Sequence, residues 1–281
     1  MKKVIMSLLL ISIVIISNFT MTFAAVGGEN ASTEEENNRL FQECYEEYLA
    51  EIEKIDQQIS PQWSSGDLTE KNPGTHGFIA TQALTIVSAN SSKLKTFLTE
   101  TRKKSLIKGS FEADIDGRST LFKDHFYLSG NKGIMGYPLS AYDNFRNHYN
   151  GAVANYKEKR YTEAMRRLGL ALHFIADINE PHNVTGKVAV LSEHTAYEKW
   201  VEKNYSSYKV SSMTTSALSA YTSKSLLTIA DASAAHARGY IDQAESSATS
   251  DRQTVTNATL KRAQKDSAGV IYKFAKEVGI I

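Results

Sequence analysis

The sequence predicts an all-α protein, a single compact multi-helix domain preceded by a signal peptide and a helical pro-segment. Apolar residues recur three and four positions apart through most of the chain, and few runs alternate with the period of two expected of a strand. The 281 residues include only four prolines, so long helices are uninterrupted. We place the three parts at residues 1–25, 26–62 and 63–281.

Residues 1–25 have the features of a secretory signal peptide. Lys2 and Lys3 precede the apolar run VIMSLLLISIVII, and the small-residue stretch TFAA predicts cleavage near Ala24 or Ala25. The run is too short for a transmembrane helix, which needs about 20 apolar residues, and no later stretch approaches that length. We therefore expect the mature protein to be secreted and soluble.

Residues 26–62 predict an acidic amphipathic helix that begins with a capping box at Ser32 or Thr33 and ends before Pro61. This segment contains ten acidic and two basic residues, whereas residues 63–281 contain 21 acidic and 28 basic. The split predicts an acidic leader on a basic body whose surface would attract anionic membranes. Two interpretations stay open, an N-terminal packing or coiled-coil helix and a pro-segment that a protease removes.

The remaining chain predicts one helical domain. Its helical stretches are residues 75–90, 140–159, 161–179, 194–205, 216–245 and 255–278. Gly-rich loops are expected between Ser110 and Tyr137, and no internal repeat or phosphate-cradling glycine motif occurs. The single cysteine, Cys44, excludes an intramolecular disulfide, so stability must come from core burial or from bound metal.

Two histidine–carboxylate pairs indicate a metal site. His173 and Asp177, like His194 and Glu198, are four residues apart, so each pair stands on one face of its helix. One such pair is typical of a surface hydrogen bond, but two pairs among seven histidines favour metal binding. Nitrogen and oxygen donors without thiolates suit a catalytic zinc with open positions. Further candidates, each also compatible with a helix cap or a buried hydrogen bond, are His76, Asp114, His125 and His182.

These residues resemble, in order and spacing, those of the bacterial zinc-dependent phospholipases C. The resemblance rests on Trp63, His76 thirteen positions later, Asp114, His125, and the segments LGLALHFIADINEPH and EHTAYEKW. It extends to about Tyr205 and is closest to the compact single-domain members, which lack the C-terminal lipid-binding β-sandwich of the larger toxins. It implies the helical fold that this family shares with zinc-dependent single-strand nucleases. It also implies that the protein is a phosphoric diester hydrolase and a monomer.

The resemblance also implies a substrate and a reaction. The enzyme would hydrolyse the glycerol-side phosphodiester bond of phosphatidylcholine-like glycerophospholipids at a membrane surface, to diacylglycerol and a phosphorylated headgroup. Phospholipid and a processing protease are then the expected partners, and nucleic acid is not.

Carried over residue by residue, the resemblance implies three zinc ions per chain. The first would be held by Asp114, His125, His173 and Asp177. The second would be held by the α-amine and carbonyl of Trp63, by His76 and by Asp177 as a bridge. The third would be held by His194, Glu198 and a histidine after Pro181. Asp114 would also orient or deprotonate the attacking water.

The role of Trp63 has a chemical consequence. A free α-amine can bind a metal when it is deprotonated, but the same nitrogen inside a peptide bond has no lone pair to offer. Cleavage between Gln62 and Trp63 is therefore required to complete the second site. We predict that the uncut chain is a zymogen.

The third site departs from the family pattern. His182 directly follows Pro181, and Asn183 stands where the metal-binding histidine is expected. Either the turn shifts by one residue so that His182 reaches the metal, or the site has lost a strong ligand. We predict the shift, because a histidine is present and loop backbone is adaptable.

The headgroup pocket also departs from the pattern. Phe122 matches an aromatic residue that packs near choline in the family. Gly66 lies where an acidic residue is expected, and Ile115 lies where a tyrosine is usual. Because quaternary ammonium groups are held by aromatic faces and a carboxylate, choline preference stays open. Asp67 is the candidate to replace the missing acid.

Two alternatives compete with a phospholipase. One is a related three-zinc single-strand nuclease, against which stand the absence of disulfides and Glu198, where those nucleases more often place an aspartate. The other is a non-catalytic exported helical protein with one structural zinc or none.

Overall fold

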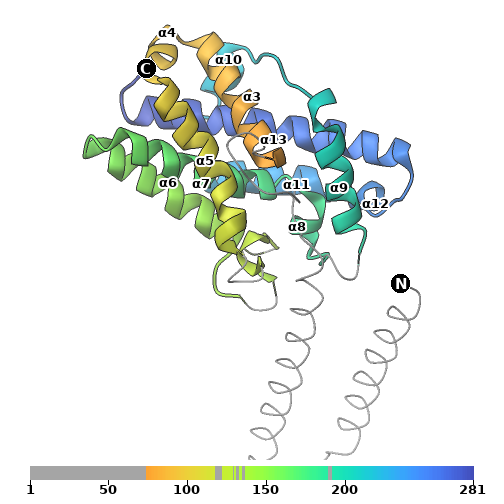
Figure 1. The fold of residues 1–281 in the computed structure, drawn as a ribbon. Coiled ribbons are helices and arrows are strands. Elements are labelled where there is room, and N and C mark those ends of the chain that lie inside the picture. Colours follow the sequence, from red (N-terminus) through yellow and green to blue (C-terminus); the bar gives the residue numbers. More distant parts are fainter. Residues whose placement is uncertain (1–73, 118–121, 129, 131–132, 135–136, 189–191) are drawn as a thin grey trace, which may run out of the picture. The chain divides into compact units, whose positions relative to one another are not determined.

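The computed structural model describes residues 74–117, 122–128, 130, 133–134, 137–188 and 192–281 (Figure 1). The secondary-structure elements assigned within these ranges are all helices, which confirms the predicted all-α fold. The predicted signal peptide and pro-segment lie outside the described residues, as do Trp63 and Asp67.

Most of the helices follow one another with short connections, and the connection from η2 to α6 is longer. In chain order they are α3 (Gly74–Asn90), α4 (Ser92–Phe97), α5 (Glu100–Gly117), the 3₁₀ helix η2 (Lys123–His125), α6 (Ala141–Lys157), α7 (Tyr161–Asp177), α8 (Pro181–Thr185), α9 (His194–Asn204), the 3₁₀ helix η5 (Tyr205–Ser207), α10 (Thr215–Ser219), α11 (Leu226–Arg238), α12 (Ile241–Ala244) and α13 (Thr249–Glu277). The helices predicted at 75–90, 140–159, 161–179 and 194–205 are confirmed to within two residues at each end.

The predicted helical stretch at 216–245 is wrong as a continuous element. It divides into α10, α11 and α12. Ser225 starts α11 because its side chain accepts a hydrogen bond from the backbone N–H of Thr228, which makes it an N-cap rather than a helix-interior residue. The apolar spacing alone does not reveal this break.

The loops predicted from Ser110 onward are also wrong in their first part, because α5 continues to Gly117. A Cβ atom at Gly109 would collide with the carbonyl oxygen of Arg166 in α7, and one at Gly169 would collide with that of Leu106 in α5. These glycines therefore allow two helix backbones to approach closely and do not mark a turn. The residues after Gly109, including Asp114, consequently lie on a helix.

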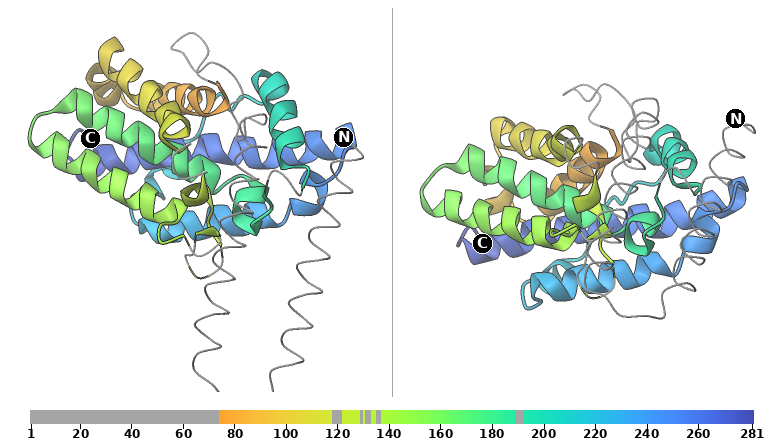
Figure 2. Two further views of the ribbon diagram at one scale, coloured as in Figure 1. Left: turned by 60° about the horizontal axis from the view of Figure 1, so that its bottom comes forward. Right: turned by 90° about the horizontal axis from the view of Figure 1, so that it is seen from below.

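Helix α7 is the central helix of the fold. It packs alongside α5 and α6, and the long helix α13 crosses it and packs on α3 (Figures 1 and 2). Met165, Leu168, Leu172 and Ile175 form its buried apolar stripe, with the three–four spacing of a helix face. Its C-terminal turn carries His173 and Asp177 into the same buried region, where charge is costly unless it is paired.

A buried carboxylate on α13 fixes the chain just after α7. The Asp266 side chain accepts hydrogen bonds from Asn179 Nδ2 (3.2 Å), Ser233 Oγ (2.7 Å) and Tyr221 Oη (2.5 Å). Arg262 Nε donates to both of its oxygens, at 3.0 and 2.9 Å. Asn179, two residues beyond the end of α7, is thereby held in place.

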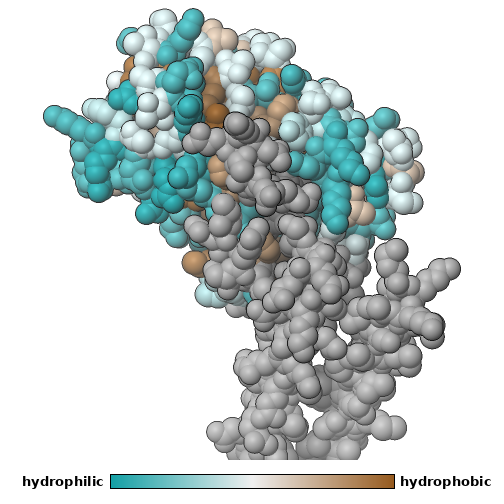
Figure 3. All heavy atoms as spheres, in the orientation of Figure 1, coloured by the Kyte–Doolittle hydropathy of each residue, from teal (hydrophilic) through white to brown (hydrophobic). Residues whose placement is uncertain are grey.

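The described surface is largely polar. Leu139 and Leu227 are the exposed large hydrophobic residues within the described ranges. The face drawn in Figure 3 accordingly shows hydrophilic residues with small, separate apolar areas. No described helix combines the length and the hydropathy that a bilayer span requires.

Candidate metal centre

The structure brings the described metal-ligand candidates together in two buried clusters. We call the first the Asp177 cluster, which comprises His76, Asp114, His125, His173 and Asp177. We call the second the Glu180 cluster, which comprises Glu180, His182, His194 and Glu198. All nine side chains belong to residues that are at most 5% exposed.

The Asp177 cluster draws on four helices. His76 lies in the first turn of α3, Asp114 near the end of α5, His125 in η2, and His173 and Asp177 on one face of α7. The start of α3 is anchored to α9, because Glu202 Oε2 accepts hydrogen bonds from Thr75 N (3.1 Å) and Thr75 Oγ1 (2.7 Å). The predicted pairing of His173 with Asp177 is confirmed, with Nε2 3.1 Å from Oδ2.

Donor atoms gather around Asp177 Oδ2 at distances that suit one zinc ion. His125 Nδ1 lies 2.9 Å from this oxygen and 3.1 Å from His173 Nε2, and Asp114 Oδ1 lies 3.6 Å from His173 Nε2. A tetrahedral zinc with bonds of about 2.0–2.1 Å keeps its ligand atoms roughly 3.3 Å apart. The measured separations bracket that value, so these four side chains fit zinc.

Hydrogen bonding around these four side chains leaves lone pairs directed at the space between them. His173 Nδ1 donates to the carbonyl oxygen of Ser110 at 2.9 Å, which leaves Nε2 of the neutral ring as an acceptor or metal ligand. Neither carboxylate oxygen of Asp114 has a hydrogen-bond partner among the described residues. A buried carboxylate without hydrogen bonds is costly, and a bound cation would remove that cost.

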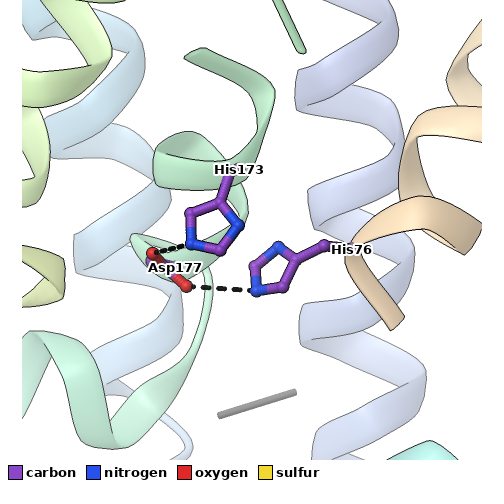
Figure 4. A group of neighbouring side chains, drawn as sticks. All are labelled: His76, His173 and Asp177. Atoms are coloured by element: carbon purple, nitrogen blue, oxygen red, sulfur yellow. Dashed lines mark ion pairs between the residues drawn. The ribbon is translucent and has the colours of Figure 1, made fainter. Parts of the chain in front are cut away.

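The second oxygen of Asp177 faces a different histidine. Oδ1 lies 3.4 Å from His76 Nε2, and the His76 ring stacks on the His173 ring with centroids 3.9 Å apart (Figure 4). One carboxylate thus faces donor groups on two sides. This is the geometry that a bridging ligand between two metals requires.

Charge coupling is strong inside the Asp177 cluster. Burial alone would lower the pKa of His173, but the carboxylates of Asp177 and Asp114 outweigh it and raise the pKa to about 9. Burial would raise the pKa of Asp177, yet the neighbouring His173 and His125 hold it well below its usual range. The cluster therefore attracts positive charge, whether as protons or as a metal ion.

Phe122 borders the Asp177 cluster. Its ring packs edge-on against His125 with centroids 5.5 Å apart, and only 7% of the residue is exposed. Its backbone has a φ of 57°, in the left-handed region that bulky residues rarely occupy. The structure thus places this headgroup-pocket candidate next to a candidate metal ligand.

The Glu180 cluster forms where α8 and α9 begin. Pro181 is the first residue of α8, and His194 is the first of α9. His182 and His194 stack with centroids 4.6 Å apart and ring planes 6° apart. The predicted pairing of His194 with Glu198 is confirmed, with Nε2 2.9 Å from Oε1. The structure therefore places His182 beside His194, as the predicted shift requires.

Two carboxylates near these histidines were not predicted as site residues from the sequence. Glu180 Oε1 lies 2.7 Å from His182 Nδ1, and Glu245 Oε1 lies 3.0 Å from His182 Nε2. A signal for Glu180 was present, because a glutamate directly before a proline that starts a helix stands in the N-cap position. No local pattern indicates Glu245, which reaches the cluster from the end of α12.

A family model described as "Zinc dependent phospholipase C" matches residues 75–268, a range that contains both clusters. The chain belongs to the zinc-dependent phospholipase C family. Within this family, it is 29% identical over 163 residues to a phospholipase C of Bacillus cereus, covering 54% of this chain and 57% of that protein. It is 26% identical over 235 residues to a phospholipase C of Clostridium haemolyticum, covering 73% and 59%. The chain thus spans less than three fifths of the length of these relatives.

Two solved structures show the same fold. The alpha toxin of Clostridium absonum matches with a TM-score of 0.69 at 21% identity, covering 76% of this chain and 66% of that one. The alpha-toxin of a Clostridium perfringens avian strain matches with a TM-score of 0.65 at 23% identity, covering 73% and 64%. Family membership and the nitrogen and oxygen donors of both clusters together fit zinc.

Proposed function

We propose that the protein is a secreted zinc-dependent phospholipase C. It cleaves the glycerol-side phosphodiester bond of phosphatidylcholine-like glycerophospholipids and releases diacylglycerol and a phosphorylated headgroup. The observation that carries this proposal is Asp177, whose two oxygens face donor groups on two sides. Two adjacent cation sites suit a phosphodiester, which carries its negative charge on two non-ester oxygens.

Three zinc ions per chain are proposed. The first has Asp114, His125, His173 and Asp177 as ligands. The second has the Trp63 amine and carbonyl, His76 and Asp177, and the third has His182, His194 and Glu198. When bound, zinc would neutralise charge on the phosphodiester and lower the pKa of the attacking water.

The side chains of the protein supply the positioning. The hydrogen bond from His173 Nδ1 to Ser110 holds Nε2 toward the Asp177 carboxylate. Asp114 is proposed as the catalytic residue that orients the attacking water or accepts its proton, because its two oxygens have no hydrogen-bond partner among the described residues. Burial of these groups excludes bulk water, which strengthens electrostatic interactions within the site. Phe122 and Asp67 are proposed to contact the headgroup.

The test is a substrate comparison with the chain cut before Trp63 and loaded with zinc. Phosphatidylcholine vesicles should yield diacylglycerol, a chelator should abolish the release, and added zinc should restore it. Faster cleavage of single-stranded DNA would instead favour the nuclease. Bound zinc without either activity would overturn the enzymatic proposal. Glu100→Gln, at the exposed first residue of α5 and at the opposite end of this helix from Asp114, is the control variant.

A further inference from the structure

We propose that Glu180 is a ligand of the metal in the Glu180 cluster, and that Glu245 positions His182 from outside the metal. The inference rests on the proposed function for the identity of the metal. It adds a ligand and a positioning residue that the family pattern does not supply.

Each histidine of this cluster has one nitrogen turned inward and one turned outward. His194 Nδ1 donates to the carbonyl oxygen of Lys187 at 3.0 Å, so Nε2 of the neutral ring carries a lone pair. This Nε2 faces Glu198 Oε1 at 2.9 Å and Glu180 Oε2 at 3.6 Å. A lone pair that faces two carboxylates requires a cation or a proton between them.

His182 repeats this arrangement with its nitrogens exchanged. Its Nε2 lies 3.0 Å from Glu245 Oε1, and its Nδ1 lies 2.7 Å from Glu180 Oε1. A neutral imidazole has one N–H, so it can donate to only one of the two carboxylates. Donation to Glu245 leaves the Nδ1 lone pair facing Glu180. A histidine that donates its outer N–H to a carboxylate while its inner nitrogen binds metal is a recurrent zinc arrangement.

The positive charge in this cluster could come from one metal ion or from protonation of both histidines, and electrostatic repulsion favours the metal ion. Glu180, Glu198 and Glu245 bring three negative charges around two stacked rings. Protonation of both histidines would place two like charges in rings 4.6 Å apart and 0–3% exposed. One divalent ion provides the same charge at the point where the inner nitrogens and carboxylates meet, without that repulsion.

Glu180 is preorganised for this task. Its Oε2 accepts a hydrogen bond from the backbone N–H of Asn183 at 2.8 Å, which caps α8, while Oε1 remains directed at His182. Glu245 is fixed likewise, because its Oε1 also accepts a hydrogen bond from the backbone N–H of Glu193 at 3.2 Å. Neither carboxylate has to be ordered when metal binds.

The experiment measures zinc binding to the full chain, independently of activity. Zinc content under a competing chelator and zinc affinity by calorimetry are compared for wild type, Glu180→Gln, Glu245→Gln and the control Glu100→Gln. Glutamine at 180 keeps an oxygen that can accept from the Asn183 N–H, so the cap is retained. Melting temperatures of the metal-free variants report any separate effect on the fold.

For Glu180→Gln we expect one zinc fewer per chain, or one site weakened more than about 100-fold, and for Glu245→Gln the same site weakened by about 10–100-fold. The melting temperature of metal-free Glu180→Gln should fall by less than that of its zinc-loaded form, and the Glu100→Gln control should bind zinc as wild type does. Unaltered zinc number and affinity in Glu180→Gln would overturn the inference, as would a loss of affinity matched by an equal loss of metal-free stability. Zinc-loaded wild type that has been cut before Trp63 and still fails to hydrolyse phospholipid would overturn only the proposed function.

Discussion

Asp177 Oδ1 lies 3.4 Å from His76 Nε2, so a carboxylate in the last turn of α7 reaches a histidine in the first turn of α3. Because Oδ2 serves the opposite donor group, Asp177→Asn should weaken both sites at once. We expect zinc content to fall and hydrolysis to drop by more than about 100-fold. Metal analysis and a phospholipid assay check this, with Asp251→Asn as the control. Retention of both metal and activity would rule out the bridge.

Cleavage before Trp63 should switch on activity, because only a free α-amine offers a lone pair to the second site. The chain beginning at Trp63 should hydrolyse phospholipid at least roughly tenfold faster than the uncut chain and bind one more zinc. A chain beginning at Gln62 is the matched control, since its amine is displaced by one residue. Equal activity of the uncut chain and the chain beginning at Trp63 would refute the zymogen.

Zinc binding should release protons and strengthen with pH. Although burial lowers it, the carboxylates raise the pKa of His173 and of His194 to about 9, so both rings are protonated in the metal-free protein at neutral pH. Zinc must displace these protons. Calorimetry in buffers of different ionisation enthalpy should detect the release, and its absence at pH 7 would contradict the protonation of both rings.

The metal-free protein should show the opposite pH trend. The folded-state pKa of His173, about 9, exceeds the unfolded value of about 6.5, so its stabilisation is complete below pH 6.5 and is lost as pH rises through 9. The melting temperature with chelator should therefore fall between pH 6.5 and 9, while the increase caused by zinc should grow. A melting temperature independent of pH over this range would count against the buried ion pair.

Gly109→Ala should destabilise the fold, because its Cβ would meet the Arg166 carbonyl oxygen at the contact between α5 and α7. We expect a loss of about 1–3 kcal/mol in the free energy of unfolding, measured with denaturant. Gly151→Ala is the matched control, since its Cβ would meet only the Arg167 side chain at 3.7 Å. That variant should be neutral or more stable by up to about 1 kcal/mol. Equal effects would show that the helix contact is not limiting.

Local spacing predicted much of the fold. The three–four pattern located α3, α6, α7 and α9, and it placed His173 with Asp177 and His194 with Glu198. These relationships lie within single helices, where residue spacing determines side-chain direction. The resemblance to the family then named the ligands from other helices, and the structure brings the described ones together.

What the sequence did not reveal depends on long-range contacts. Loops were expected from Ser110 onward, because only the approach of α7 shows that the missing Cβ of the preceding Gly109 allows helix packing. Glu245 joins His182 from a helix far along the chain, and no local pattern indicates it. Ser225 interrupts a stretch whose apolar spacing is otherwise that of a helix.

The stretch from Asp177 to His182 contributes residues to both clusters. Asn179 within it donates a hydrogen bond to Asp266. Inserting or deleting one residue there would turn Glu180 and His182 away from their partners or pull Asn179 off its anchor. We therefore expect this stretch to accept exchanges of side chains at fixed length but no change of length. At this fixed length, a metal-binding histidine can stand at position 182 instead of 183, because the backbone that carries both positions stays the same.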